Sequence, residues 1–232
     1  MNDNEADSVR YLFDGLAARY DAANHLLSLG LDLYWRKAAI DLAAAKISND
    51  LLDLCCGTGD FAFGFARGSP NLKTITACDF SKAMIKIARN KRKPHSEKIR
   101  WHVVDCLNTP FEDGSFDIAS CAFGMRNLTA LETGCRELYR LLRRGGRACI
   151  LEFSLPRNPV LEKLYLFYVH YFLPLFGGII TGKFSAYKYF AGTVKYWSEN
   201  IDLKKELTAA GFEKITVKEL SFGIVTVHIA HK

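Results

Sequence analysis

The chain has 232 residues, of which 49% are hydrophobic and 24% charged, and its formal net charge at pH 7 is +6. These values are typical of a globular protein with a sizeable core and exclude a disordered or collagen-like chain. The seven cysteines form no Cys-x-x-Cys pair, so we expect buried free thiols and no metal site. The acidic stretch 1–7 is unlike a signal peptide and predicts a cytoplasmic protein.

Helical spacing of apolar residues predicts two helices at the start, over 8–20 and 31–45, which together form a helical cap over residues 1–46. Strand-like and helix-like segments then alternate. The expected strands are 51–55, 74–78, 99–104, 117–122 and 147–153, and the expected helices between them are 60–67, 81–92 and 129–143. A glycine pair at 145–146 should break the chain before the fifth strand. Such alternation predicts a parallel sheet with helices on both faces.

The first strand runs into a glycine turn, Gly57-Thr58-Gly59, and a helix start follows. Glycines let the backbone approach a ligand closely, and a helix N-terminus offers unpaired N–H groups. The spacing suits both a dinucleotide and S-adenosylmethionine. Asp53 and Asp60 bring two carboxylates to the turn, which favours the cationic S-adenosylmethionine over a pyrophosphate. Thr58 should reach the amino-acid end of the cofactor.

Acidic residues also end the next two strands, where a doubly wound sheet binds its ligand. We expect Asp79 to accept the ribose hydroxyls, while Ser81 caps the following helix. Phe80 is placed to flank the adenine. Asp105 should accept a hydrogen bond from the adenine amino group, and the backbone N–H of Cys106 should donate to the ring.

Two polar residues after the fourth strand, Arg126 and Asn127, are candidates for contact with the substrate. Arg126 could hold an oxyanion or lower the pKa of a hydroxyl. The alternative is a surface arginine paired with Glu132 or Glu137. His170 is interpreted either as a general base or as a histidine in an aromatic cluster.

The segment 156–200 is rich in aromatic residues and is predicted to be an insertion or lid. Its apolar part, 164–180, spans 17 residues and contains Pro174 and two glycines, so a broken segment dipping into one leaflet is favoured over a membrane span. An ordinary buried helix is the alternative. The basic run 82–98 is interpreted first as a solvated helix face, then as a membrane contact, with nucleic acid last.

A helix over 203–210 and two closing strands, 215–220 and 222–230, complete the chain. Five alternating strands with a terminal pair are typical of a class I S-adenosylmethionine-dependent methyltransferase. This is an α/β, Rossmann-like fold with a seven-stranded, mostly parallel sheet and helices on both faces. We expect residues 1–232 to form a single domain of this class.

Four segments carry a more specific signal. They are Tyr20-Asp21-x-x-Asn24-x-x-Leu27-Ser28 with its continuation to Trp35-Arg36, the loop 52–60, the stretch 123–127 and the stretch 140–154. On these segments nearly the whole chain resembles the menaquinone/ubiquinone-biosynthesis C-methyltransferase family, of the demethylmenaquinone methyltransferase type. The chain departs from the family pattern at Ala23, Asp32, Ala122 and 143–144.

The resemblance implies methylation of a ring carbon of a prenylated quinol by S-adenosylmethionine, with demethylmenaquinol as the first choice. The benzoquinol precursor of ubiquinone, 2-methoxy-6-polyprenyl-1,4-benzoquinol, is the alternative. Arg126, Asn127 and Tyr20 are then the expected catalytic residues, which orient the quinol and stabilise its phenolate. The prenyl tail should leave along 160–190 and the N-terminal helices, which predicts peripheral membrane contact and no nucleic-acid partner.

Three other functions stay open at this point. They are methylation of another lipophilic acceptor, reduction by an NAD-dependent enzyme, and cofactor binding without catalysis. The oligomeric state is also open, a homo-oligomer included.

Overall fold

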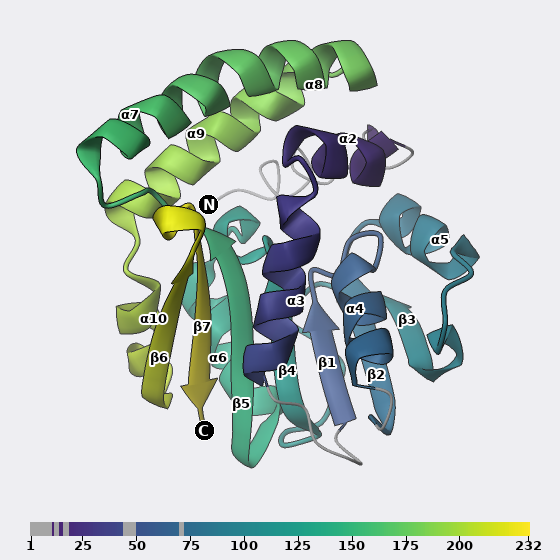
Figure 1. The fold of residues 1–232 in the computed structure, drawn as a ribbon. Coiled ribbons are helices and arrows are strands. Elements are labelled where there is room, and N and C mark those ends of the chain that lie inside the picture. The colour runs from purple at the N-terminus through teal and green to yellow at the C-terminus, as the bar shows by residue number, and fades with distance from the viewer. Residues whose placement is uncertain (1–10, 12–13, 16–18, 44–49, 70–71) are drawn as a thin grey trace.

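The computed structural model describes residues 11, 14–15, 19–43, 50–69 and 72–232. Most of the helix predicted over 8–20 lies outside these residues, and residues 44–46 of the predicted cap lie wholly outside them. Seven strands form one sheet in the order β3-β2-β1-β4-β5-β7-β6 (Figure 1). Their bounds are β1 Asp50–Leu54, β2 Thr74–Asp79, β3 Ile99–Val103, β4 Phe116–Ala122, β5 Leu142–Phe153, β6 Glu213–Leu220 and β7 Val225–His231.

Strand β7 runs antiparallel to β5 and β6, whereas the other neighbouring strands are parallel. The strand order reverses between β1 and β4, which is where sheets of this type bind their ligands. The predicted class I fold, with its closing strand pair, is therefore confirmed.

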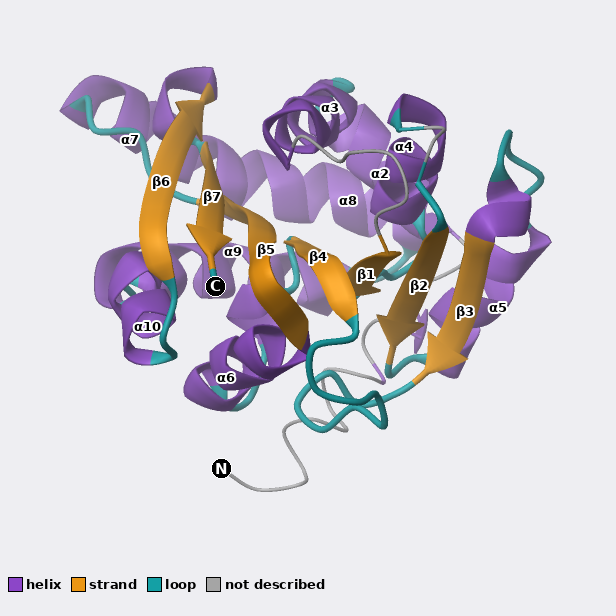
Figure 2. Ribbon diagram, turned by 90° about the horizontal axis from the view of Figure 1, so that it is seen from below, coloured by secondary structure: helices purple, strands orange, loops and turns teal. Residues whose placement is uncertain are grey.

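Helices cover both faces of the sheet (Figure 2). The described helices are α2 Tyr20–Leu27, α3 Leu31–Ala43, α4 Asp60–Gly68, α5 Lys82–Asn90, α6 Leu131–Leu141, α7 Pro159–Phe167, α8 Leu173–Thr181, α9 Phe184–Asn200 and α10 Leu203–Ala209. Neighbouring side chains in a strand point to opposite faces. Leu51 accordingly packs with α3 and α4, and Leu52 with α6 and α10.

The fifth strand begins earlier than predicted. It starts at Leu142, so the glycine pair lies inside it. The pairing of β5 with β4 shifts in register there: Phe116 pairs with Leu142, and Ile118 pairs with Arg147. Gly145 has a φ of 76° within this irregularity. The glycines thus bend a continuous strand rather than preceding it.

The expected break within 164–180 is wrong. Helices α7 and α8 join through a π-helical turn, Tyr168–Phe172, into one continuous helix, 159–181. The turn lies just before Pro174 and accommodates the hydrogen bond that proline cannot donate. A Cβ on Gly177 would meet the Tyr187 ring at 2.6 Å, so this glycine permits close packing on α9.

Among the described residues, this helix also has the length and composition needed to span a membrane, and 22% of its apolar 18-residue stretch is buried.

The seven cysteines are free, and six of them are buried, as expected. Ser81 caps α5, since its side chain accepts from the N–H of Met84 at 3.1 Å. The basic residues of α5, Lys82, Lys86 and Arg89, are exposed.

Candidate functional site

A cavity of about 340 Å³ lies at the carboxyl ends of β1, β2, β3 and β4. Of the residues predicted to bind the cofactor, five line it: Gly57, Asp79, Phe80, Asp105 and Cys106. They come together because parallel strands end at the same edge of the sheet. Apolar walls from Met84 and Val103 complete a site that can take a planar base.

Asp79 is the best-defined polar group of this cavity. Its Oδ2 accepts the Gly57 N–H at 2.8 Å and its Oδ1 accepts the Ser81 N–H at 2.9 Å. Burial raises the pKa of Asp79 to about 6, and the two backbone donors oppose this. Each oxygen keeps a lone pair for a ribose hydroxyl.

The third strand ends at Val103, two residues before Asp105. The Asp105 carboxylate accepts the N–H of Leu107 at 2.9 Å, which fixes the loop at the cavity wall. The Cys106 Sγ accepts the N–H of Cys55 at 3.3 Å and so ties this loop to the glycine turn.

Two predicted cofactor residues, Asp53 and Thr58, line a smaller cavity of about 30 Å³, which adjoins the first because both are lined by Tyr20, Cys55 and Gly57. Burial raises the pKa of Asp53 to about 7, although its hydrogen bond from Ser120 at 2.8 Å acts in the opposite direction. Thr58 donates to Asp21 on α2. Asp53 and Thr58 thus lie beside the turn in the smaller cavity, and Thr58 also ties the turn to α2.

Asp60 was expected to attract the cationic cofactor, but other charges engage it. Its Oδ1 lies 2.9 Å from Lys91 Nζ, and its Oδ2 lies 3.6 Å from His25 Nε2. Burial alone would raise the pKa of Asp60, but the charges of Lys91, Arg36 and His25, with the hydrogen bond from Lys91, together lower it. The electrostatic preference for a cation therefore rests on Asp53 and Asp79.

The glycines of the turn serve different purposes. A Cβ on Gly57, which has a φ of 54°, would meet no described atom within 4 Å, so its backbone is open to the cavity. A Cβ on Gly59 would lie 2.3 Å from the Trp101 ring. Gly59, which lines neither cavity, is therefore required for packing and for its φ of 90° at the start of α4.

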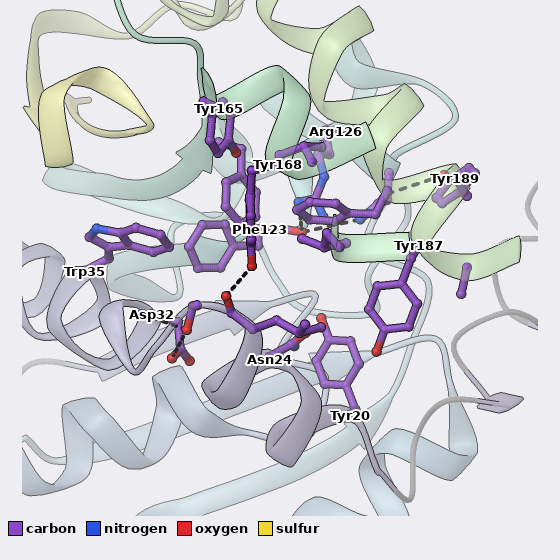
Figure 3. Close-up of a pocket in the computed structure, with 18 of the residues that line it drawn as sticks. Tyr20, Asn24, Asp32, Trp35, Phe123, Arg126, Tyr165, Tyr168, Tyr187 and Tyr189 are labelled. Atoms are coloured by element: carbon purple, nitrogen blue, oxygen red, sulfur yellow. Dashed lines mark hydrogen bonds between the residues drawn. The ribbon is translucent and has the colours of Figure 1, made fainter. Parts of the chain in front are cut away.

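A second pocket, of about 120 Å³, adjoins the first and is shown in Figure 3. Tyr20, Phe123 and Asn127 line both, so a ligand in one faces a ligand in the other. The polar lining groups of the second pocket lie on α2, α3 and the turn after β4. Its aromatic walls come largely from 165–190, the predicted lid segment.

Arg126 lines this second pocket and is buried, with 5% of its side chain exposed. Its Nη1 lies 2.8 Å from Glu152 Oε1 and donates to the Phe123 carbonyl oxygen at 2.6 Å. The guanidinium also lies 5.1 Å from the centre of the Phe190 ring. Its buried Nε has no hydrogen-bond partner among the described residues, so it keeps one donor for a ligand.

The alternative pairing for Arg126 is wrong. Glu132 pairs with Arg136, and Glu137 with Arg140, both on α6. The true partner, Glu152, was missed. The available signal was an acid directly after the apolar run 148–151 in the second half of β5.

Asn127 and Tyr20 complete the polar side of this pocket. The Asn127 Nδ2 donates to the Phe123 carbonyl oxygen at 3.3 Å, and its Oδ1 accepts from Tyr189 at 3.4 Å. Burial raises the pKa of Tyr20, and the nearby charges of Arg126 and Arg36 oppose this. All three predicted catalytic residues therefore meet at one pocket.

An apolar groove of about 640 Å³ extends from the second pocket to the protein surface. Pocket and groove share Leu27, Trp35, Tyr165 and Tyr168, among others. The outer residues of the groove are strongly exposed and come from α2, α3, the helix 159–181 and the turn before β7; they include Leu26, Leu29, Leu164, Phe176 and Phe222.

His170 does not line these cavities. It is exposed, and its Nδ1 lies 2.9 Å from the Leu166 carbonyl oxygen. Neither the general-base nor the aromatic-cluster interpretation therefore applies to it.

Comparison with known proteins decides the family. The model of a family described as "ubiE/COQ5 methyltransferase family" matches residues 1–232 of this chain. The chain belongs to the ubiE/COQ5 methyltransferase family. A demethylmenaquinone methyltransferase of Thermus thermophilus is 39% identical over 95% of this chain and 100% of that protein. A ubiquinone/menaquinone biosynthesis C-methyltransferase of Geotalea uraniireducens is 37% identical over 98% of this chain and 97% of that protein.

Solved structures agree on the fold of this ubiE/COQ5 family member. An S-adenosylmethionine-dependent methyltransferase of Thermotoga maritima has a TM-score of 0.66 at 20% identity, covering 95% of this chain and 98% of that one. A Haloferax volcanii methyltransferase, solved with the activator Trm112, has a TM-score of 0.67 at 15% identity, covering 94% and 96%. Membership of this family makes the protein a methyltransferase, and the reductase and non-catalytic alternatives are set aside.

No functional role was predicted from the sequence for several residues of the second pocket in this family member, notably Asp32, Trp35, Arg36 and Tyr168. Tyr168 donates to the Leu27 carbonyl oxygen at 2.5 Å and so fastens the helix 159–181 to α2. Asp32 was noted as a departure from the family pattern, and that departure was the available signal for it.

Proposed function

We propose that this chain transfers the methyl group of S-adenosylmethionine to a ring carbon of a prenylated quinol. Its relatives are named as demethylmenaquinone and ubiquinone/menaquinone biosynthesis methyltransferases, and the reaction follows from membership of their family. The observation that carries the proposal is the position of the aromatic pocket between two other cavities. It shares Tyr20, Phe123 and Asn127 with the cofactor-type cavity, and it shares Trp35 and Tyr165 with the apolar groove.

The residues of the first cavity fit S-adenosylmethionine. A buried carboxylate, Asp79, faces the ribose position; Asp105 and the apolar walls suit the adenine; and Gly57 leaves the backbone open. When bound there, S-adenosylmethionine supplies an electrophilic methyl group. Asp53, in the adjoining smaller cavity, supports a positive charge, since a neighbouring cation favours its ionised form.

The second pocket suits a quinol ring. Phe123 and Phe153 lie with their ring centres 4.5 Å apart, and Trp35 contacts both rings edge-on, so a flat ring finds aromatic walls. Arg126, Asn127 and Tyr20 are placed to orient the ring oxygens and to stabilise a phenolate. A phenolate directs electron density to the adjacent ring carbon, which is the atom that receives the methyl group.

The groove suits a prenyl tail, and its exposed rim suits a membrane. Leu29 is 86% exposed and Phe222 is 82% exposed, on separate elements of one face. Exposed apolar patches of this kind are typical of interaction sites. We infer a cytoplasmic enzyme that contacts the inner face of the membrane through this rim while the tail lies in the groove.

Turnover with two acceptors tests the reaction. The enzyme is incubated with labelled S-adenosylmethionine and either reduced demethylmenaquinol or the reduced benzoquinol precursor, and labelled methylated quinol is quantified. We expect methylation of the naphthoquinol. Failure to label either quinol would refute the proposed function, and labelling of the benzoquinol alone would reassign the acceptor.

Vesicle flotation tests the membrane contact. We expect the protein to float with liposomes of mixed anionic and neutral lipids, and the double variant Leu29→Asp/Phe222→Asp to float much less. Val217→Asp changes an exposed apolar residue on β6 outside the groove and serves as the control. Equal flotation of all three proteins, or of none, would contradict the proposed membrane face.

A further inference from the structure

The reaction requires an acceptor for the quinol hydroxyl proton, and the second pocket contains one acidic side chain among its described lining residues, Asp32. It lies in the first turn of α3, with 6% of its side chain exposed. Its Oδ1 accepts from Ser28 Oγ at 2.8 Å, and its Oδ2 lies 2.8 Å from Arg36 Nη1. Asp32 is thus a buried, firmly oriented carboxylate in the wall of the quinol pocket.

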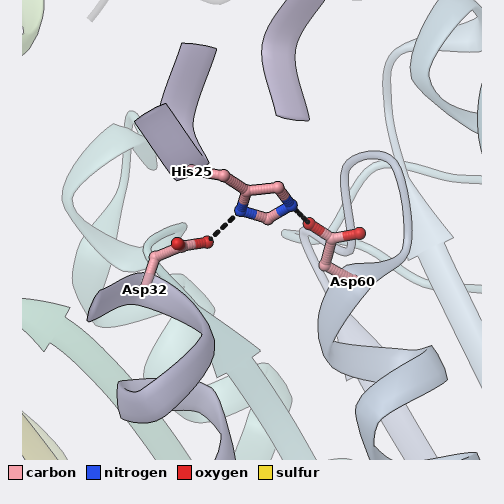
Figure 4. Close-up of side chains that lie close together, drawn as sticks. All are labelled: His25, Asp32 and Asp60. Carbon is pink, nitrogen blue, oxygen red and sulfur yellow. Dashed lines mark hydrogen bonds and ion pairs between the residues drawn. The ribbon is translucent and has the colours of Figure 1, made fainter. Parts of the chain in front are cut away.

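A histidine links this carboxylate to the outside (Figure 4). His25 Nδ1 lies 2.8 Å from Asp32 Oδ2, and its Nε2 lies 3.6 Å from Asp60 Oδ2 at the start of α4. The His25 side chain is 33% exposed. The ring therefore contacts the buried acid through one nitrogen and a partly exposed acid through the other.

The same three side chains could in principle hold a metal ion, because their ligand atoms lie within 4.8 Å of one another. Cations already neutralise both carboxylates: Arg36 lies 2.8 Å from Asp32, and Lys91 lies 2.9 Å from Asp60. Lys91 also pairs with Asp21 at 2.6 Å. A divalent ion would face these two cations at close range, so the arrangement suits proton transfer better than metal binding.

The other polar groups of the pocket suit binding rather than proton acceptance. Arg126 is held by Glu152, and a guanidinium stays protonated. Burial raises the pKa of Tyr20, which keeps its hydroxyl neutral. The buried Nε of Arg36 has no hydrogen-bond partner among the described residues, so Arg36 can donate to a quinol oxygen beside Asp32.

We propose that Asp32 is the base that accepts the quinol hydroxyl proton, and that His25 passes this proton to solvent. The inference rests on the proposed quinol methylation. The O–H bond of the quinol breaks and an O–H bond forms on Asp32. His25, neutral with its proton on Nε2, then accepts that proton at Nδ1 and becomes an imidazolium, which releases its Nε2 proton to water. Exchange of the ring protons with water restores the Nε2–H form before the next turnover.

The electron pair left on the quinol oxygen enters the ring. The ring carbon forms its bond to the methyl group as the bond between that methyl group and sulfur breaks. The hydrogen on the same carbon is afterwards lost as a proton, and the oxygen regains one, which restores the aromatic quinol. One proton is released per methyl group transferred, and it is the one that leaves through His25.

The decisive variant is Asp32→Asn, which keeps the size of the side chain and removes its basicity. We expect kcat to fall about 100-fold at pH 7, a usual loss for a general base. Affinity for S-adenosylmethionine should not change. The loss should shrink as the pH rises, because the quinol then ionises without help; a purely structural role of Asp32 would give no such recovery. Asp41→Asn, on the exposed face of α3, is the matched control.

His25→Gln provides a second test that does not depend on the folding of the first variant, since His25 lies partly at the surface. As a positioning and relay residue, it should affect kcat but not KM, and the acidic limb of the kcat–pH profile should change. The groups that face this path and enter the profile are Asp32, Arg36, Asp60 and Lys91. His95→Gln, on an exposed loop, is the control.

The outcomes separate the two proposals. A wild-type enzyme that methylates neither quinol refutes the proposed function itself. An active wild-type enzyme, together with Asp32→Asn of unchanged kcat, or with a loss that stays constant with pH, overturns the role of Asp32. His25→Gln with wild-type kcat at every pH overturns the relay.

Discussion

The cofactor cavity and the quinol pocket adjoin, yet they are built in different ways. Except for Tyr20, the residues that line the cofactor cavity fall within 55–129 and follow the ends of four parallel strands. The quinol pocket draws its walls from three separate parts of the chain: 20–36, 123–153 and 165–190. One site is therefore a property of the sheet edge, and the other a property of helices packed above it.

This difference has a physical basis. Backbone hydrogen bonds of the sheet position the groups of the cofactor cavity, and Asp79 is itself held by two backbone N–H groups. Side-chain contacts between α2, α3 and the helix 159–181 position the groups of the quinol pocket, such as the bond from Tyr168 to Leu27. We therefore expect changes in one site to leave ligand binding at the other largely intact.

The largest effect should come from Arg126→Ala. Turnover should fall about 1,000-fold, because the phenolate loses its main charged neighbour. Cofactor affinity, measured by calorimetry, should stay at the wild-type value. Glu152 would remain buried without its cation, which costs about 3 kcal/mol of stability.

A double variant, Arg126→Met/Glu152→Gln, separates stability from catalysis. It removes both members of the buried pair and should recover most of the melting temperature without recovering turnover. Restored turnover in this variant would show that Arg126 acts only by neutralising Glu152.

Asp79→Asn should weaken S-adenosylmethionine binding about 30-fold, the effect of losing roughly 2 kcal/mol of charged hydrogen bonding. The KM for the quinol at saturating cofactor should not change. Asp113→Asn, which alters an exposed acid, is the control. A parallel loss of quinol affinity would contradict the separation of the two sites.

The pH dependence of cofactor binding tests Asp53. Burial raises its pKa to about 7, and a cationic ligand favours the ionised form, so affinity should weaken as the pH falls below 7. The slope can reach about tenfold per pH unit. Titration calorimetry from pH 8 to 5.5 measures it, and Asp53→Asn should flatten the curve.

The stability of the ligand-free protein should respond to pH in the opposite direction. The folded-state pKa of Asp53 lies above its ordinary value, so the folded protein binds this proton more tightly than the unfolded chain does. The contribution therefore grows as the pH falls from about 7 toward 4 and is lost as the pH rises through 7. Asp79, with a pKa of about 6, acts in the same sense at lower pH. Thermal melts across this range measure the effect.

The smallest expected effect lies in the groove. Leu164→Glu should raise the KM about fivefold for a quinol with a long prenyl tail, because about 1 kcal/mol of apolar contact is lost. The KM for a short-tailed quinol should not change. Equal changes for both substrates would place the tail elsewhere.

The sequence predicted the cofactor side well and the quinol side less completely. Gly57, Asp79 and Asp105 could be placed because strand ends in an alternating pattern meet at one edge. Arg126 was identified by its place after the fourth strand and Tyr20 by resemblance, but the partner Glu152 was missed. The break at Pro174 was predicted wrongly, since a π-turn accommodates the proline within a continuous helix.

What the sequence determined by itself was the sheet, the glycine turn and the class of cofactor, because these depend on local periodicity and on residues near one another along the chain. Only the tertiary structure decided which charges are free. Asp60 is engaged by Lys91, Arg126 by Glu152, and Asp32 is joined to the surface through His25. Such pairings depend on which helices pack together, and sequence spacing does not encode them.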